Sequence, residues 1–380
     1  MMKKILKNEA VQSLITSLIC ILIGMLVGYI VLLIIEPSGA AESILAVAKN
    51  FFGYSRANMR LKHLGTTLVK TAPLIMCSLS VLFSYKVGLF NIGAAGQYVM
   101  GACACIYAAL GWGWNWLPCM IFAGVVGAAY GMITGALKAY FNVNEVISGI
   151  MLNWIGLYFT NMVLANVKDS ASAYTYTFKA AGKEAILPSL GLDKFLSGNQ
   201  YVSIAIPLSI IFAILVWVVL NKTKFGFELK ATGYNKHAAK YCGMAEKRNI
   251  IISLAISGAL AGLAGSFLYQ TDIEQWQVTL SSVPGMGFNG IAAAFLGGLN
   301  PIGAIFSSFF IQHITEGGSH VDLTIYCSQI SELISSLIIY LCGFVGFLKM
   351  AMNTALARSE EKKLAKEAAK IAEEEKGGDK

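Results

Sequence analysis

A succession of long apolar runs restricts the possible folds of this chain more than any other feature of its sequence. A helix needs about 20 predominantly apolar residues to cross the hydrocarbon core of a bilayer. With 56% hydrophobic and only 13% charged residues, a chain of 380 residues has too little polar surface for a soluble globular fold. The sequence therefore predicts an all-α polytopic membrane protein with about ten transmembrane helices, at 11–35, 63–84, 92–112, 117–140, 147–167, 201–220, 249–269, 286–299, 302–317 and 326–349.

Two of these runs, 92–112 and 286–299, are rich in glycine and carry polar residues, which indicates short or broken helices buried by their neighbours. Each one begins at a Phe-Asn pair followed by small residues, Phe90-Asn91 and Phe288-Asn289, which lie 198 positions apart. Paired glycine-interrupted segments are typical of transporters built from two related halves, with the pathway at the interface of the repeats. We therefore expect two related halves.

The longest strongly polar interruption in the middle of the chain spans residues 221–248, with seven basic residues against two acidic ones. The positive-inside bias places it on the cytoplasmic side. Asn235 is a suitable N-cap for a short helix, and Gly243 is suited to end it. The N-terminal lysines, followed by an even number of spans, predict that both termini are cytoplasmic. The predicted organisation is a transmembrane domain at 1–352, with a cytoplasmic segment at 222–247 and an extracellular loop at 168–200, and a charged cytoplasmic tail at 353–380.

No pattern for catalysis or for a bound metal stands out in the sequence. There is no P-loop, no HExxH and no GxSxG motif, the four histidines are dispersed, and the eight cysteines contain no CxxC pair. The net charge of +8 comes largely from lysines flanking the spans, which favours a membrane topology signal over nucleic-acid binding. We therefore expect neither an enzyme nor a metal or cofactor site. Lys70, inside the second span, is expected to extend its long stem to the outer surface. Glu145 fits the N-terminus of a helix.

Four stretches together resemble the permease subunits of ABC importers of the branched-chain amino acid, ribose and simple-sugar class. They are GLFNIGAAGQ at 88–97, FNVNEVISGIMLNW at 141–154, GYNKHAAKYCGM at 233–244 with the following LAISGALAGLAG at 254–265, and PGMGFNGIAAAFLGGLNPIGAI at 284–305. Within the class, the chain looks most like the nucleoside (basic membrane protein-associated) permeases, from roughly residue 61 to residue 348. It departs from the family pattern at Ala95, where glutamate is common.

The resemblance implies a role and a set of partners. Residues 233–243 look like the coupling helix that docks on an ATPase subunit, with the docking residues Gly233, Tyr234, Asn235, Ala238, Ala239, Tyr241 and Gly243. The implied partners are a second permease subunit, an ABC ATPase that binds Mg-ATP, and an extracellular substrate-binding lipoprotein, assembled in the cell membrane. The permease chain itself performs no chemistry in such a system.

Neutral polar groups in apolar spans are the candidates for the substrate pathway, because such groups are costly in lipid and tend to face a cavity or another helix. Their amides suit the edges of a base or sugar hydroxyls, and neighbouring aromatic rings can stack a base. The candidates are Phe90, Asn91, Gln97, Asn153, Trp154, Phe288 and Asn289. Interhelical hydrogen bonding is the alternative role for each polar residue.

Two other functions stay open from the sequence. The same machinery would import a simple sugar such as ribose, or a branched-chain amino acid, although the neutral polar candidates disfavour a carboxylate-bearing cargo. A secondary transporter driven by an ion gradient would be expected to keep intramembrane acidic residues, and mid-span Asp or Glu is nearly absent apart from Glu332 near the start of the last span.

Overall fold

The computed structural model describes residues 9–319 and separate positions between 326 and 358. The described part is helical, and it contains no strand, only two isolated β-bridges. The predicted span at 326–349 and the tail at 353–380 lie largely outside the described residues. The long helices are α2 (Glu9–Ile35), α3 (Ala40–Lys49), α4 (Ala57–Tyr85), α5 (Ala94–Leu110), α6 (Trp116–Phe141), α7 (Glu145–Leu164), α10 (Ala205–Lys222), α11 (Lys224–Tyr234), α13 (Glu246–Tyr269), α14 (Met286–Leu296) and α15 (Pro301–Gly318).

Each apolar run between residues 11 and 317 forms a helix close to its predicted bounds. Within the described residues, five helices are long and apolar enough to cross a membrane: α4, α6, α7, α10 and α13. The runs predicted to be broken form the shorter apolar helices α5 and α14, of 17 and 11 residues. The prediction of an all-α polytopic membrane protein is confirmed.

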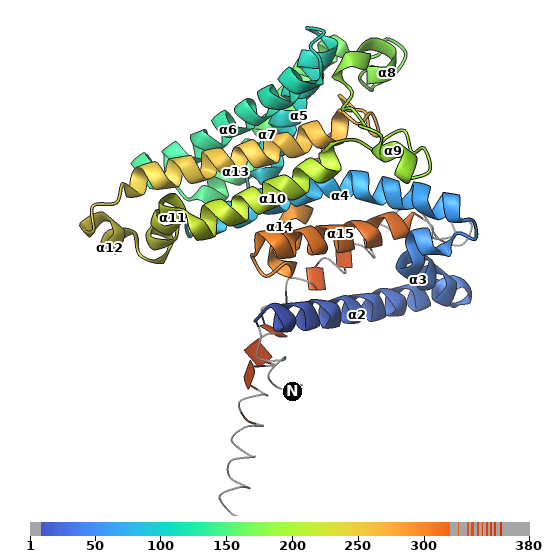
Figure 1. Cartoon of the computed structure of the whole chain (residues 1–380), viewed down its shortest axis with the longest axis horizontal. Helices are drawn as coiled ribbons and strands as arrows, with labels where there is room; N and C mark the ends of the chain where they lie inside the picture. The colour runs from blue at the N-terminus through green and yellow to red at the C-terminus, as the bar shows by residue number, and fades with distance from the viewer. Residues whose placement is uncertain are drawn as a thin grey trace, which may run out of the picture.

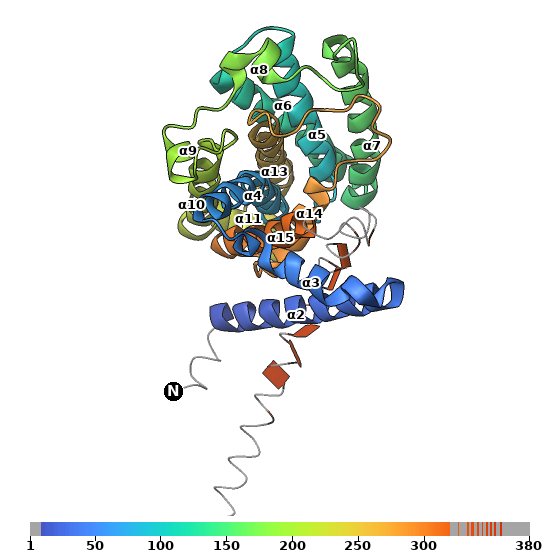
Figure 2. The ribbon, with the colours of Figure 1, turned by 90° about the vertical axis from the view of Figure 1, so that its right-hand side faces the viewer.

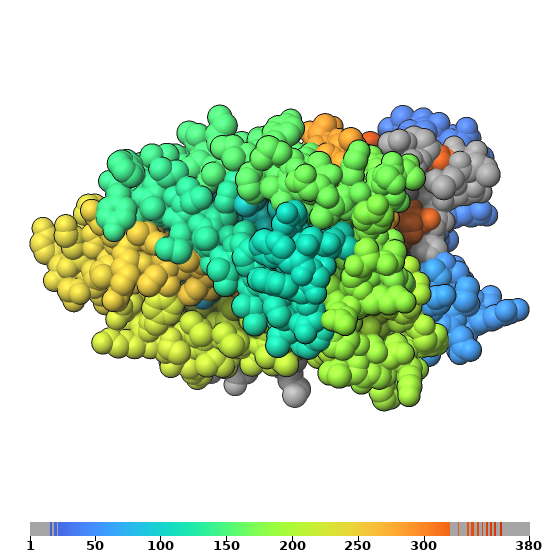
Figure 3. Space-filling model, turned by 90° about the horizontal axis from the view of Figure 1, so that it is seen from above, coloured from blue at the N-terminus to red at the C-terminus, as the bar shows by residue number. Residues whose placement is uncertain are grey.

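Helix α13 lies at the centre of the bundle (Figure 2). It packs against α6 and α5 on one side and against α4 on the other. Helices α10, α14 and α15 surround α4, and α2 lies along one edge of the bundle (Figure 1). The short helix α12 (Lys236–Tyr241) marks one end of the bundle, and α8 (Phe178–Ala181) and α9 (Leu192–Phe195) lie at the opposite end. Seen from above, the segment around α12 forms one tip of the molecule (Figure 3).

Glycines bring the backbones of α6 and α13 into direct contact. A Cβ atom built on Gly258 would lie 2.2 Å from the carbonyl oxygen of Gly127, and one built on Gly262 would lie 2.3 Å from that of Ala123. A Cβ atom built on Gly131 would lie 2.2 Å from the carbonyl oxygen of Leu254. Small residues permit this approach in lipid, where helices associate by packing rather than by the hydrophobic effect.

The loop predicted at 168–200 is tied to a second loop, which joins α13 to α14. The Thr175 amide donates to the Trp276 carbonyl at 2.9 Å, and the Leu187 amide donates to the Gln270 carbonyl at 3.0 Å. The Trp276 ring is fully buried, and its Nε1 donates to Asn161 Oδ1 at 2.9 Å. These contacts form an ordered cap at the α9 end of the bundle.

Candidate functional site

The polar segment at 221–248 folds as predicted around a short helix. Thr223 caps α11, and Asn235 caps α12 by accepting hydrogen bonds at its Oδ1 from the His237 amide at 3.0 Å and the Ala238 amide at 3.1 Å. Gly243 follows α12 with φ +78°, a conformation that favours glycine. The caps therefore fix α12 as a separate turn of helix between α11 and α13.

The predicted coupling residues divide into an outer and an inner set. Tyr234 is 91% exposed and Tyr241 is 93% exposed, and the Ala238 side chain is also exposed. Ala239 is only 4% exposed, so it packs within this chain. A Cβ atom on Gly233 would lie 2.6 Å from the Lys86 carbonyl oxygen, so this glycine holds the segment against the loop after α4. The surface that α12 offers to another molecule is formed by the outer set.

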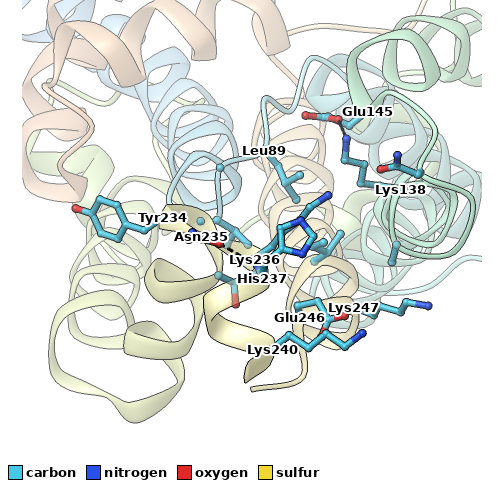
Figure 4. A pocket seen from close by; sticks show the side chains of 17 residues that line it. Leu89, Lys138, Glu145, Tyr234, Asn235, Lys236, His237, Lys240, Glu246 and Lys247 are labelled. Atoms are coloured by element: carbon cyan, nitrogen blue, oxygen red, sulfur yellow. Dashed lines mark hydrogen bonds and ion pairs between the residues drawn. The ribbon is translucent and has the colours of Figure 1, made fainter. Parts of the chain in front are cut away.

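A cavity of about 550 Å³ lies beside α12 (Figure 4). Its walls come from the loop after α4, the corner between α6 and α7, the segment Thr232–Lys240 and the start of α13. Lys138 and Glu145 face each other across that corner at 2.8 Å. Asn142, with φ 52°, turns the chain between them. Glu145 begins α7 as predicted, and its ion pair is an addition that the sequence did not suggest.

Positive charge accumulates at this end of the bundle. Burial lowers the pKa of Lys86, next to the cavity-lining Val87, and the neighbouring charge of Lys230 lowers that pKa further. Arg248 lies 3.8 Å from Glu228 and is largely exposed. The α12 end is therefore a basic surface.

Three of the predicted pathway amides bind one another and the backbone. Asn91 Nδ2 donates to Gln97 Oε1 at 2.9 Å, and both residues are buried. Asn153 Oδ1 accepts from the Gly96 amide at 2.7 Å, and its Nδ2 donates to the Ile92 carbonyl at 3.1 Å. These bonds fix the entry into α5, and the one from the Gly96 amide satisfies a donor that has no partner within the first turn of the helix.

The other predicted pathway residues are more accessible. Trp154 is 42% exposed and Phe288 is 40% exposed, while Phe90 and Asn289 are half-buried. Trp154 stacks on Tyr158, with ring centroids 6.1 Å apart. These four side chains are therefore more exposed than the amides of Asn91, Gln97 and Asn153.

The structure brings the two Phe-Asn segments together. A Cβ atom on Gly287 would lie 2.4 Å from the Ala95 Cα, so the first turns of α5 and α14 touch at these residues. Neither N-cap residue, Gly93 or Gly285, provides a side-chain cap. Two helices thus begin side by side inside the bundle, each from a glycine that has no capping side chain.

Lys70 is in an ion cluster, and the prediction that it reaches the outer surface is wrong. Its Nζ lies 2.9 Å from Glu316 Oε1 and 3.5 Å from Glu274 Oε1. The Lys70 side chain is 24% exposed and that of Glu316 is 17% exposed. Gln312 Nε2 also donates to Glu316, at 3.2 Å. A lysine within one apolar run and a glutamate at the end of another were the signal that such a pair exists.

Comparisons with known proteins agree with this architecture. The chain is 32% identical to the guanosine ABC transporter permease protein NupP of Bacillus subtilis, over 83% of this chain and 88% of the relative. It is 31% identical to the nucleoside ABC transporter permease protein NupB of Lactococcus lactis, over 78% and 83%. It is 28% identical to the glucose ABC transporter permease protein TsgB13 of Haloferax volcanii, over 72% and 73%. No solved structure matches the chain.

A family model described as a branched-chain amino acid transport system permease component matches residues 63–343. The match covers the bundle from α4 through α15, including the paired segments and α12. This chain therefore belongs to the branched-chain amino acid transport system permease family and is a permease subunit of an ABC transporter.

Proposed function

We propose that this chain forms the membrane pathway of an ATP-driven importer of nucleosides. The observation that carries the proposal is the extent of its similarity to two permeases named for guanosine and nucleosides, NupP and NupB. A separate ATPase that binds Mg-ATP supplies the energy. A second permease subunit completes the membrane part, and an extracellular lipoprotein delivers the substrate. Both termini and α12 face the cytoplasm.

A sugar importer is the second candidate, because the glucose permease TsgB13 also matches, at 28% identity. Its coverage of this chain is lower than that of NupP, at 72% against 83%. The amide of Asn289, which is neutral, suits either cargo. The similarity to NupP and NupB favours nucleosides.

We place the pathway along the region where α5 and α14 begin. The first turns of these helices, whose N-cap residues are glycines, meet at Ala95 and Gly287. In this proposal Phe90, Phe288 and Trp154 offer faces for a nucleobase, and Asn289 offers an amide. Asn91, Gln97 and Asn153 act as positioning residues, since their hydrogen bonds hold the entry into α5.

One uptake assay tests both the cargo and the pathway. Cells that express the complete transporter should accumulate labelled guanosine, and unlabelled nucleosides should compete while glucose and ribose do not. Phe288→Ala should lower the rate of uptake at least about fivefold, because loss of a stacking surface costs roughly 1 to 3 kcal/mol per base. Leu190→Ala, at an exposed site on the α9 end, is the control. Competition by glucose alone would contradict the nucleoside assignment, and normal uptake by Phe288→Ala would contradict the pathway.

The exposed face of α12 is proposed to dock on the ATPase. Ala238→Arg places a long charged side chain on that face and should weaken association with the ATPase at least about tenfold. Co-purification of the two subunits measures this loss. Ala165→Arg makes the same change at the exposed C-terminal end of α7, at the opposite end of the bundle, and should leave association unchanged. Equal co-purification of both variants would contradict docking through α12. Ala239→Arg is unsuitable, because Ala239 is buried within this chain.

A further inference from the structure

The cavity beside α12 is lined by an excess of positive charge. Four lysines from three helices surround it, namely Lys138 near the end of α6, Lys236 and Lys240 on α12, and Lys247 in the first turn of α13. Glu145 and Glu246 are the acidic residues in its wall, so the net charge is +2 with His237 neutral. The His237, Lys240 and Lys247 side chains lie on one side of the cavity, opposite Lys138 (Figure 4).

An apolar strip begins at the same corner of the fold. Phe141 is 75% exposed, Tyr140 is 64% exposed and Ile147 is 60% exposed, all within a few residues of the Lys138–Glu145 ion pair. The strip continues along α7, one of the helices long enough to cross the membrane. Lys247 Nζ lies 5.3 Å from the centre of the Tyr140 ring, so the basic and apolar surfaces are in contact. The basic cavity and the apolar strip therefore adjoin at one corner of the fold.

We propose that this cavity binds the phosphate of an anionic phospholipid, whose acyl chain lies along Phe141 and Ile147. Basic pockets between transmembrane helices on the cytoplasmic side have the chemistry to hold lipid head groups. The cytoplasmic position of the cavity rests on the proposed function, through the orientation of α12. A free phosphate would use the lysines but not the apolar strip, and an acidic protein side chain would likewise leave that strip unexplained. The lipid accounts for both surfaces.

A bound head group would touch α12, the corner between α6 and α7, and the start of α13 at once. Because α12 carries the proposed ATPase-docking face, the lipid would stabilise the position of that helix against the rest of the bundle. Lys138 and Lys247 contribute charge from outside α12. They can therefore be changed without altering the proposed docking face.

Native mass spectrometry of the purified full-length chain in mild detergent tests the proposal with two probes, dioleoyl phosphatidylglycerol and dioleoyl phosphatidylcholine. The wild-type chain should retain phosphatidylglycerol in preference to phosphatidylcholine. Lys138→Gln/Lys247→Gln should weaken that retention by about fivefold per lysine, or roughly 25-fold in total. Lys222→Gln/Lys224→Gln removes two exposed lysines outside the cavity and should have no effect. Lys138→Gln/Glu145→Gln removes the ion pair at the corner between α6 and α7 but preserves the net charge of the cavity, so it should retain the lipid. This variant distinguishes the effect of charge from structural damage at that corner.

Several outcomes would overturn the lipid site. These are equal retention of the two lipids, unchanged retention by the Lys138/Lys247 variant, and a loss caused equally by the Lys222/Lys224 variant. Complete displacement of the lipid by an equal concentration of inorganic phosphate would show that the cavity recognises a free anion. Displacement by the purified ATPase would show that a protein occupies it instead. None of these measurements uses transport, so a wrong nucleoside assignment would leave their result unchanged.

Discussion

Valine in place of Gly258 is expected to remove nearly all folded protein from the membrane. The first atom of any side chain at this position would lie 2.2 Å from the Gly127 carbonyl oxygen and 3.1 Å from the Gly131 Cα. All of these neighbours are backbone atoms, so no rotation of a side chain can relieve the overlap. Helices α6 and α13 would have to separate, at a cost of about 3 kcal/mol or more, the upper end for overpacking. The amount of monodisperse protein after detergent extraction measures the effect.

Gly124→Ala is the control on α6, at a glycine that faces a side chain instead of a backbone. Its new methyl group would meet the flexible end of the Leu263 side chain at 3.4 to 3.9 Å, which is ordinary van der Waals contact. This variant should be recovered at the wild-type level with an unchanged melting temperature. If Gly258→Val were recovered equally well, direct backbone contact between α6 and α13 would be refuted.

Lys70→Met is the second change with a large expected effect. It removes the ammonium group that lies between Glu316 and Glu274, at 2.9 and 3.5 Å. Breaking a buried ion pair by removing one partner costs about 3 to 5 kcal/mol, and most of that cost should come from the mostly buried Glu316. Glu274 is 45% exposed, so water screens its charge and its share is smaller. Thermal unfolding in detergent should show a clear loss of stability.

The double variant Lys70→Met/Glu316→Gln distinguishes charge from packing. It leaves one carboxylate, that of Glu274, which is exposed enough to be hydrated. Most of the lost stability should therefore return. A double variant as unstable as Lys70→Met, or a single variant as stable as the wild type, would contradict the role assigned to the cluster.

Apolar runs and capping residues in the sequence were sufficient to predict the positions of most helices. Apolar runs located α4, α5, α6, α7, α10, α13, α14 and α15, and the polar segment with Asn235 and Gly243 located α12 and both of its caps. Helix α11 was not predicted. Such features depend on neighbours along the chain, which a sequence displays directly. The two glycine-rich runs that begin at a Phe-Asn pair were predicted to form short helices, and they form α5 and α14; their contact at Ala95 and Gly287 was not predicted.

Contacts between distant residues could not be predicted in the same way. Lys70 meets Glu316 only because α4 and α15 pack together, and the sequence alone suggested that Lys70 reaches the surface. Ala238 and Ala239 look equivalent in the sequence, but the fold exposes one and buries the other. The amides of Asn91, Gln97 and Asn153 were candidates for substrate contact, and the fold gives them hydrogen bonds within the chain. In each case the packing of helices that are distant in the sequence determines the burial or the bonding partner of the side chain.

The glycine contact between α6 and α13 has a mechanical consequence. With no side chains between them to change rotamer, the two backbones cannot slide past each other without collision, so the pair behaves as one stiff rod. That rod begins three residues after the left-handed Gly243, and Asn249 ties its first turns to α11 by a 3.0 Å hydrogen bond to Thr232. A displacement imposed at α12 would thus travel the full length of the bundle as a tilt, instead of being absorbed where it was applied.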